Sequence, residues 1–204
     1  MKDIYKQNWH VLNVDVSKAL RDTFNPTEYY QNSEFKDKPV GLWAIHDKDL
    51  QTIFSDEWLA YMESIDLKVG SCLIFYREPH FVYPEIHVDV YKTDNEPAIY
   101  ALNWTLEEED DSEMVWYDIP IETGALDTHL IPTPYKWWPM SGNYPEVERR
   151  SVGNKMTIVN IGLPHNVIVN EKPRWCFSVR MYRRSKPITD WKSAVDYFKP
   201  FIVE

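Results

Sequence analysis

The chain has 204 residues, 44% of them hydrophobic and 15% aromatic, and this composition excludes an intrinsically disordered protein. The length suits one globular domain over residues 1–204. A net charge of −10 argues against a protein that binds phosphate groups through a basic face, so we expect no nucleic-acid partner.

Helical signals dominate the first part of the chain, and we expect residues 1–70 to form a helical support. A short helix is predicted over residues 16–24, because Pro26 cannot continue a helix. Ser55 is a candidate N-cap for a second helix over residues 56–65, where apolar side chains recur at helical spacing.

After Gly70 the pattern changes to short runs rich in β-branched and aromatic residues, each bounded by turn-forming residues. These runs cover residues 71–76, 84–91, 98–106, 114–119, 155–161, 166–169 and 174–182. Because no helices separate the runs, they predict a mainly β (α+β) fold, an antiparallel sandwich or jelly roll. A last short helix is expected over residues 190–198, with Thr189 as its N-cap.

Candidate metal ligands lie in two of these predicted strands. Alternate side chains of a strand point to the same face, so His87 and Asp89 point the same way. His165 comes at the start of a later strand, which a jelly roll can bring beside the first. Two imidazoles and one carboxylate are the ligands of a facial triad, which holds Fe(II) and leaves coordination positions open. We therefore interpret His87, Asp89 and His165 as catalytic metal ligands.

The run that begins at Arg174 has one polar and one apolar face. Arg174, Cys176, Ser178 and Arg180 alternate along it and share a face, opposite a face of aromatic and aliphatic side chains. If the polar face lines the interior, a guanidinium there needs an anion, because an unpaired buried charge is costly.

In this order, the HxD pair, the distal histidine and a basic residue about one strand later resemble the motif of the Fe(II)- and 2-oxoglutarate-dependent oxygenase superfamily. The similarity is to its aspartyl/asparaginyl and prolyl hydroxylase branches and to small phage-type members. It implies a double-stranded β-helix, a jelly roll of the cupin-like kind, over residues 71–182. It also implies Fe(II) on His87, Asp89 and His165, and 2-oxoglutarate as a cosubstrate anchored by Arg174.

The resemblance further implies hydroxylation of a C–H bond of a peptidyl residue or small molecule by O2, with 2-oxoglutarate decarboxylated to succinate and CO2. The assignment of two further residues to contacts with 2-oxoglutarate remains undecided. Arg180 shares the predicted face of Arg174 and is the alternative partner of the C5 carboxylate. Asn103, on the strand after the HxD pair, is a secondary candidate for contacting the cosubstrate.

Two other classes of protein fit the same residues. A cupin-like protein could use the triad with Zn2+, Ni2+ or Mn2+ and ignore 2-oxoglutarate. A non-enzymatic jelly-roll binding module could hold the histidines and the acid as structural residues. The aromatic cluster around Trp137 and Trp138 is predicted to lie in a loop, either as a substrate lid or as a satellite core.

The expected location is the cytoplasm. Cys72 and Cys176 are too few for a disulfide framework, and this indicates a reducing compartment. No stretch approaches the about 20 apolar residues of a membrane span, so no membrane partner is expected. The resemblance to phage-type members leaves open a phage protein that acts in the host cytoplasm.

Overall fold

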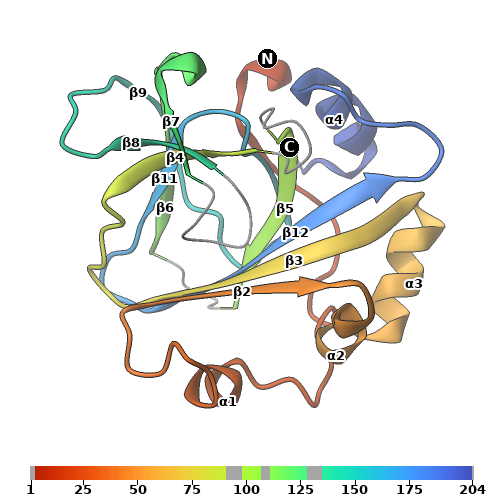
Figure 1. Cartoon of the computed structure of the whole chain (residues 1–204). Coiled ribbons are helices and arrows are strands. Elements are labelled where there is room, and N and C mark those ends of the chain that lie inside the picture. The colour runs from red at the N-terminus through yellow and green to blue at the C-terminus, as the bar shows by residue number, and fades with distance from the viewer. Residues whose placement is uncertain (1–2, 91–97, 107–110, 128–134, 204) are drawn as a thin grey trace.

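The structure of the protein is a computed structural model that describes residues 3–90, 98–106, 111–127 and 135–203 (Figure 1). Two six-stranded antiparallel sheets form its framework. In spatial order the large sheet contains β1 (Trp9–Val11), β10 (Thr157–Asn160), β5 (Tyr100–Thr105), β12 (Arg174–Arg183), β3 (Leu67–Arg77) and β2 (Val40–His46). The small sheet contains β7 (Ala125–Asp127), β8 (Tyr135–Pro139), β4 (Glu85–Asp89), β11 (His165–Ile168), β6 (Glu113–Tyr117) and β9 (Glu146–Arg150).

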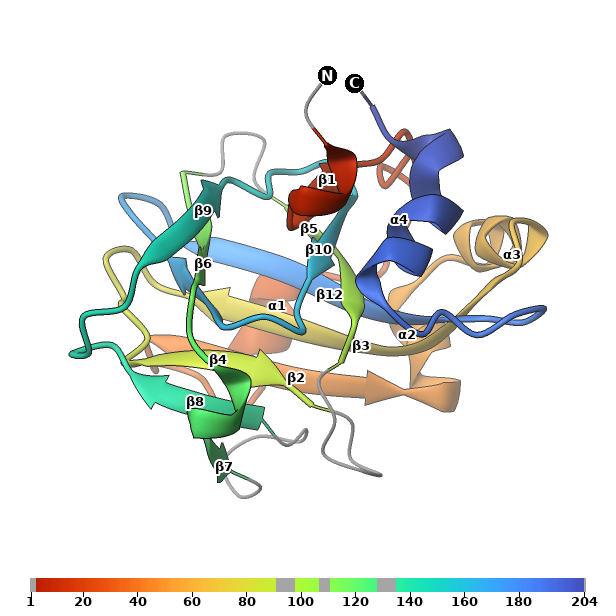
Figure 2. The same cartoon turned by 90° about the horizontal axis from the view of Figure 1, so that it is seen from above.

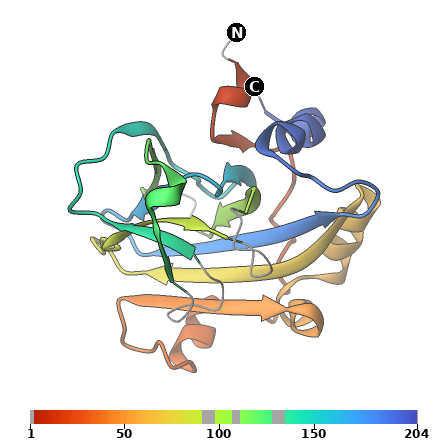
Figure 3. The same ribbon diagram turned by 45° about the horizontal axis from the view of Figure 1, so that its top comes forward.

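The strand order is that of a double-stranded β-helix. From β3 onward the chain passes back and forth between the sheets, so that β10-β5-β12-β3 face β4-β11-β6-β9. The long strands β3 and β12 cross the molecule side by side, with the small sheet on one side of them (Figure 3). The prediction of a mainly β jelly roll is therefore confirmed.

Four α-helices occur in the described residues: α1 (Pro26–Gln31), α2 (Leu50–Ile53), α3 (Asp56–Ser64) and α4 (Trp191–Phe198). Single turns of 3-10 helix lie at Ile4–Lys6, Asp47–Asp49, Ile121–Thr123 and Lys199–Phe201. The Asn13 and Val203 backbone N–H groups tie the first and last segments together by donating to Phe201 and Val11. The two chain ends accordingly lie close together beside α4 (Figure 2).

The main hydrophobic core lies between the helices and the outer face of the large sheet. Side chains of β3, β5 and β12 that point outward pack there against α2, α3 and α4. Trp104 and Phe177 stack with their ring centroids 5.4 Å apart, and both are almost fully buried. Burying such rings is a large source of stability, and it leaves the inner face of the sheet free to carry polar groups.

Two helix predictions have different outcomes. The helix over residues 56–65 is confirmed as α3, and the Ser55 side chain accepts a hydrogen bond from the Trp58 backbone N–H at 3.1 Å. The helix over residues 16–24 is wrong, because that stretch forms turns. Asn25 instead caps α1 by accepting from the Glu28 N–H, and Pro26 is its first residue. Proline is favoured there because its missing N–H has no partner in the first turn.

The last helix is also confirmed, with a shift of one residue at its start. Its N-cap is Asp190 rather than Thr189, because Asp190 and Ser193 form a reciprocal capping box.

No helix in the described part of the chain is long and apolar enough to cross a membrane. Cys72 and Cys176 are both buried, and neither forms a disulfide with another described residue.

The seven predicted strands are all present, although their ends differ by a few residues. Tyr91, at the end of one of them, lies outside the described residues. Five further strands were not predicted, and two of them, β1 and β2, lie within residues 1–70. The loop predicted around Trp137 and Trp138 is wrong, because these residues belong to β8. Trp138 packs in a small core with Ile86 on the outer face of the small sheet.

Candidate metal and anion site

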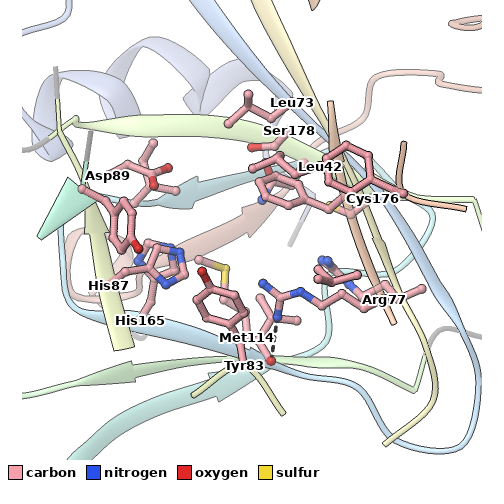
Figure 4. A pocket seen from close by; sticks show the side chains of 18 residues that line it. Leu42, Leu73, Arg77, Tyr83, His87, Asp89, Met114, His165, Cys176 and Ser178 are labelled. Atoms are coloured by element: carbon pink, nitrogen blue, oxygen red, sulfur yellow. Dashed lines mark hydrogen bonds between the residues drawn. The ribbon is translucent and has the colours of Figure 1, made fainter. Parts of the chain in front are cut away.

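A cavity of about 220 Å3 lies between the two sheets. Its lining comes from inward-facing side chains of β2, β3, β5 and β12 on one side and of β4, β6, β8 and β11 on the other. Val40, Leu42, Leu73 and Phe75 form an apolar wall. The two histidines lie together at one side of the cavity, and Arg77 reaches into it from the other (Figure 4).

The two predicted histidines are direct neighbours across strands. His87 on β4 and His165 on β11 are paired in the antiparallel register. Their ring centroids are 4.5 Å apart, and the planes are tilted by 53°. The pairing of β4 and β11 thus brings together two histidines that lie 78 positions apart in the sequence. It places both imidazoles at one side of the cavity.

The hydrogen bonding of His165 fixes its tautomer. Its Nδ1 lies 2.7 Å from the carbonyl oxygen of Leu163, and since a carbonyl can only accept, Nδ1 carries the proton and donates it. The Nε2 atom of the neutral ring is therefore unprotonated. A backbone carbonyl in this position is a common way to orient a metal-binding histidine.

Both imidazoles are kept neutral by their surroundings. Burial, followed by the neighbouring His165, lowers the pKa of His87 to about 3. Burial also lowers the pKa of His165, against an opposing effect of Asp89. The Nδ1 atom of His87 is buried and forms no hydrogen bond within the part of the chain that the structure describes. Two uncharged nitrogen donors facing one cavity suit a metal ion, because a ligating histidine must be unprotonated.

Asp89 joins the histidines at the cavity but has a partner of its own. Its Oδ2 accepts a hydrogen bond from Arg180 Nη2 at 2.5 Å, and the two side chains are 15% and 18% exposed. Arg180 also donates to Ser178 at 2.8 Å. Among the described residues, no group of three His, Cys, Asp or Glu side chains is arranged to hold a metal ion. His87, Asp89 and His165 thus line one cavity, but the carboxylate is turned to a guanidinium and the three side chains are not arranged around a common point.

Two buried arginines lie across the cavity from the histidines. Arg174 opens β12 and is 3% exposed, and Arg77 ends β3 and is 5% exposed. They are directly opposed in the strand register. The Nε atoms of both are buried and have no hydrogen-bond partner among the described residues. Within the described ranges, neither guanidinium forms an ion pair with a carboxylate.

Arg77 differs from Arg174 in having two contacts within the protein. Its Nη1 donates to the Val167 carbonyl oxygen at 2.9 Å, and its guanidinium lies 5.3 Å from the centroid of the Tyr83 ring. Burial, and next the charge of Arg174, lower the pKa of Arg77 to about 10. Arg77 thus stays charged at neutral pH.

Asn103 also lines the cavity, as a buried side chain on β5 opposite Ser178 of β12. Its Oδ1 is buried and has no hydrogen-bond partner. An unpaired amide oxygen in such a place is costly unless a donor reaches it. Asn103 therefore offers an acceptor to a ligand or a water molecule.

The structure gathers five of the predicted site residues around the cavity, namely His87, Asp89, Asn103, His165 and Arg174. Arg180, the sixth, contacts Asp89 behind them. Arg77 was not predicted. A signal for it exists, because Leu73, Phe75 and Arg77 alternate along one strand face, and that face ends in a charge.

The fold and the residues around its cavity define a jelly-roll protein with two neutral histidines, one carboxylate and two buried arginines that have no carboxylate partner among the described residues. No protein-family model matches the chain. No curated protein matches it either.

Among solved structures the chain is similar to a prolyl-4-hydroxylase of Pseudomonas putida, with 16% identity, a TM-score of 0.41, and coverage of 72% of this chain and 73% of that one. It is similar to Peruvianin-I, a cysteine peptidase from Thevetia peruviana latex, with 11% identity, a TM-score of 0.34, and coverage of 90% and 93%. A vicilin from Solanum melongena has 10% identity and a TM-score of 0.34, with coverage of 89% and 44%. At these TM-scores, none of the three assigns a function to the chain.

Proposed function

We propose that this protein is an Fe(II)- and 2-oxoglutarate-dependent oxygenase that hydroxylates a C–H bond of a peptidyl residue or a small molecule. The observation that carries the proposal is that neutral nitrogen donors lie at one side of the cavity, and at the other side lie guanidiniums without a carboxylate partner among the described residues. A small ligand with a metal-binding end and a carboxylate end fits such a cavity. 2-Oxoglutarate is a ligand of this kind.

In this proposal His87, Asp89 and His165 hold the iron. The nitrogen donors suit Fe(II), because both imidazoles are unprotonated and the Leu163 carbonyl oxygen orients one of them. Bound iron would supply the activation of O2, coupled to decarboxylation of 2-oxoglutarate to succinate and CO2. Asp89 would have to turn one carboxylate oxygen toward the metal while Arg180 keeps the other.

The other polar groups of the cavity then bind and orient the cosubstrate. Arg174 holds the C5 carboxylate, since its buried guanidinium has no carboxylate partner among the described residues. Arg180 is the weaker candidate for this role, because its guanidinium already forms an ion pair with Asp89. The Asn103 Oδ1 accepts a hydrogen bond from a donor in the cavity. The apolar wall excludes water from the reacting C–H bond.

A second function is favoured by the contact between Asp89 and Arg180. With this carboxylate engaged at 2.5 Å, the cavity suits an anion-binding module that takes a small carboxylate and uses no metal. In either case we propose a cytoplasmic location, because two cysteines are too few for a disulfide framework. The two functions differ in whether Fe(II) binds at His87.

Anaerobic absorption spectroscopy with Fe(II), before and after 2-oxoglutarate, tests the proposal. We expect a weak visible charge-transfer band that needs the cosubstrate and is lost in His87→Ala and Arg174→Ala. Arg183→Ala is the matched control, because Arg183 lies on the same strand but pairs with Asp66 at 3.0 Å, away from the cavity. No band in the wild-type protein would reject the oxygenase, and in that case retained binding of a carboxylate would support the anion-binding module.

A further inference from the structure

Arg77 occupies a position that is unfavourable unless an anion is present. It lies directly opposite Arg174 in the register of β3 and β12, and like charges at directly opposed positions of a sheet repel each other. Both side chains are almost fully buried, so water does little to screen this repulsion. A buried pair of arginines destabilises the empty cavity, and a shared negative charge would offset that cost.

The contacts of the two guanidiniums leave donors for such a charge. Arg77 uses one nitrogen on the Val167 carbonyl oxygen, and its Nε is without a partner, as is the Nε of Arg174. The Val167 carbonyl oxygen and the Tyr83 ring hold Arg77 in place, but they bring no formal negative charge. The dashed hydrogen bond in Figure 4 shows how Arg77 is held while its side chain lies in the cavity lining.

We propose that Arg77 and Arg174 together bind one carboxylate group of a small dicarboxylate, with Arg77 as a second anchor. The inference deepens the proposed function, since it assigns the distal carboxylate of the cosubstrate to two guanidiniums instead of one. Its first step, binding of an anion, needs no metal. It can therefore be tested separately from the oxygenase chemistry.

The rest of the cavity favours a carboxylate carried on a carbon chain. Leu42, Leu73 and Phe75 form an apolar wall of the same cavity, and methylene groups packed against such side chains leave water favourably. The volume of about 220 Å3 limits the ligand to a small molecule. Inorganic phosphate would bring charge without any apolar part, and it serves as a comparison.

Thermal unfolding of the metal-free protein, with and without glutarate, measures this binding, because a ligand of the folded state raises the melting temperature. We expect glutarate to stabilise the wild-type protein, and Arg77→Met to bind it at least tenfold more weakly. Without ligand, Arg77→Met should melt at the same or a higher temperature, because it removes a buried repulsion. Arg77→Lys, which keeps the charge but not the planar fork, should bind with intermediate affinity.

Arg183→Met is the matched control, since it removes an arginine of the large sheet that does not line the cavity. Pentanoate, with the same chain length and a single carboxylate, provides a second comparison in the same assay. An equal glutarate shift in wild type and Arg77→Met would overturn the proposal. A phosphate shift as large as that of glutarate, lost in Arg77→Met, would overturn the assignment to a dicarboxylate.

Failure of this proposal differs from failure of the proposed function. If Arg77→Met keeps both the glutarate shift and the absorption band with Fe(II) and 2-oxoglutarate, Arg77 is not an anchor, and the oxygenase stands. If glutarate binding depends on both arginines but the wild-type protein shows no band, the shared anion site stands, and the oxygenase is rejected.

Discussion

At the scale of single residues, the contact between Asp89 and Arg180 determines whether the carboxylate could turn toward a metal ion, as the proposed function requires. The carboxylate has one oxygen on the guanidinium and lies beside two neutral imidazoles. Arg180 in turn donates to Ser178, which fixes its direction. An arginine in this place acts as a positioning residue, because it restricts the rotation of the carboxylate without lining the cavity itself.

A double-mutant cycle in the metal-free protein tests whether this ion pair is formed. Both side chains are less than one-fifth exposed, so their coupling should exceed that of a surface pair and reach about 1–2 kcal/mol. The cycle uses Asp89→Asn, Arg180→Gln and the double variant, with unfolding free energies measured in urea. The exposed pair of Lys192 and Asp196 is the reference, and its coupling should be smaller because water screens exposed charges. Equal coupling energies in the two pairs would show that the Asp89–Arg180 ion pair is no stronger than an exposed one.

At the scale of helices and strands, local signals predicted most elements, and their failures have physical reasons. Asn25-Pro26 was interpreted as a stop, although a capping side chain followed by proline is equally a start, and only packing on the sheet decides between them. Strand β9 is a charged edge strand with little apolar alternation, because exposed edges are protected by charge. Its sequence therefore resembles a loop.

The candidate site was predictable where it depends on alternation along one strand. The shared face of His87 and Asp89, and that of Arg174 and Ser178, followed from the period of a β-strand alone. Arg77 was missed because its role depends on the register of β3 against β12, and no single run of residues encodes that register. The same holds for the Asp89–Arg180 pair, since it joins strands of different sheets.

Helix α3 provides a test at this scale, because its start depends on one side chain. The Ser55 hydroxyl accepts from the Trp58 N–H and donates to the Lys18 carbonyl oxygen at 2.7 Å. We expect Ser55→Ala to lower the free energy of unfolding by about 1 kcal/mol, measured by urea unfolding. Ser64→Ala is the control, because this exposed hydroxyl near the end of the helix bonds only the Tyr61 carbonyl oxygen. A loss as large in Ser64→Ala would mean that capping is not the cause.

At the scale of the whole molecule, the two faces of the large sheet lie in different environments, a packed core on one side and a cavity on the other. Its outer face is sealed by helices around side chains such as Trp104 and Phe177. Its inner face meets the small sheet and leaves a cavity with two buried charges. The apolar burial on one face therefore supplies the stability that permits an incompletely packed, polar site on the other.

Two adjacent residues of β3 test this division, because Leu73 lines the cavity and Ile74 points into the helix-covered core. Leu73→Phe extends into open space, so its unfolding free energy should stay within about 1 kcal/mol of wild type, while stabilisation by glutarate should be lost. Ile74→Phe overpacks a closed core, and we expect it to cost about 1–3 kcal/mol and to leave the glutarate effect intact. Urea unfolding with and without glutarate measures both quantities. If Leu73→Phe is destabilised as much as Ile74→Phe, the sheets are closely packed at that point, and the ligand must bind elsewhere.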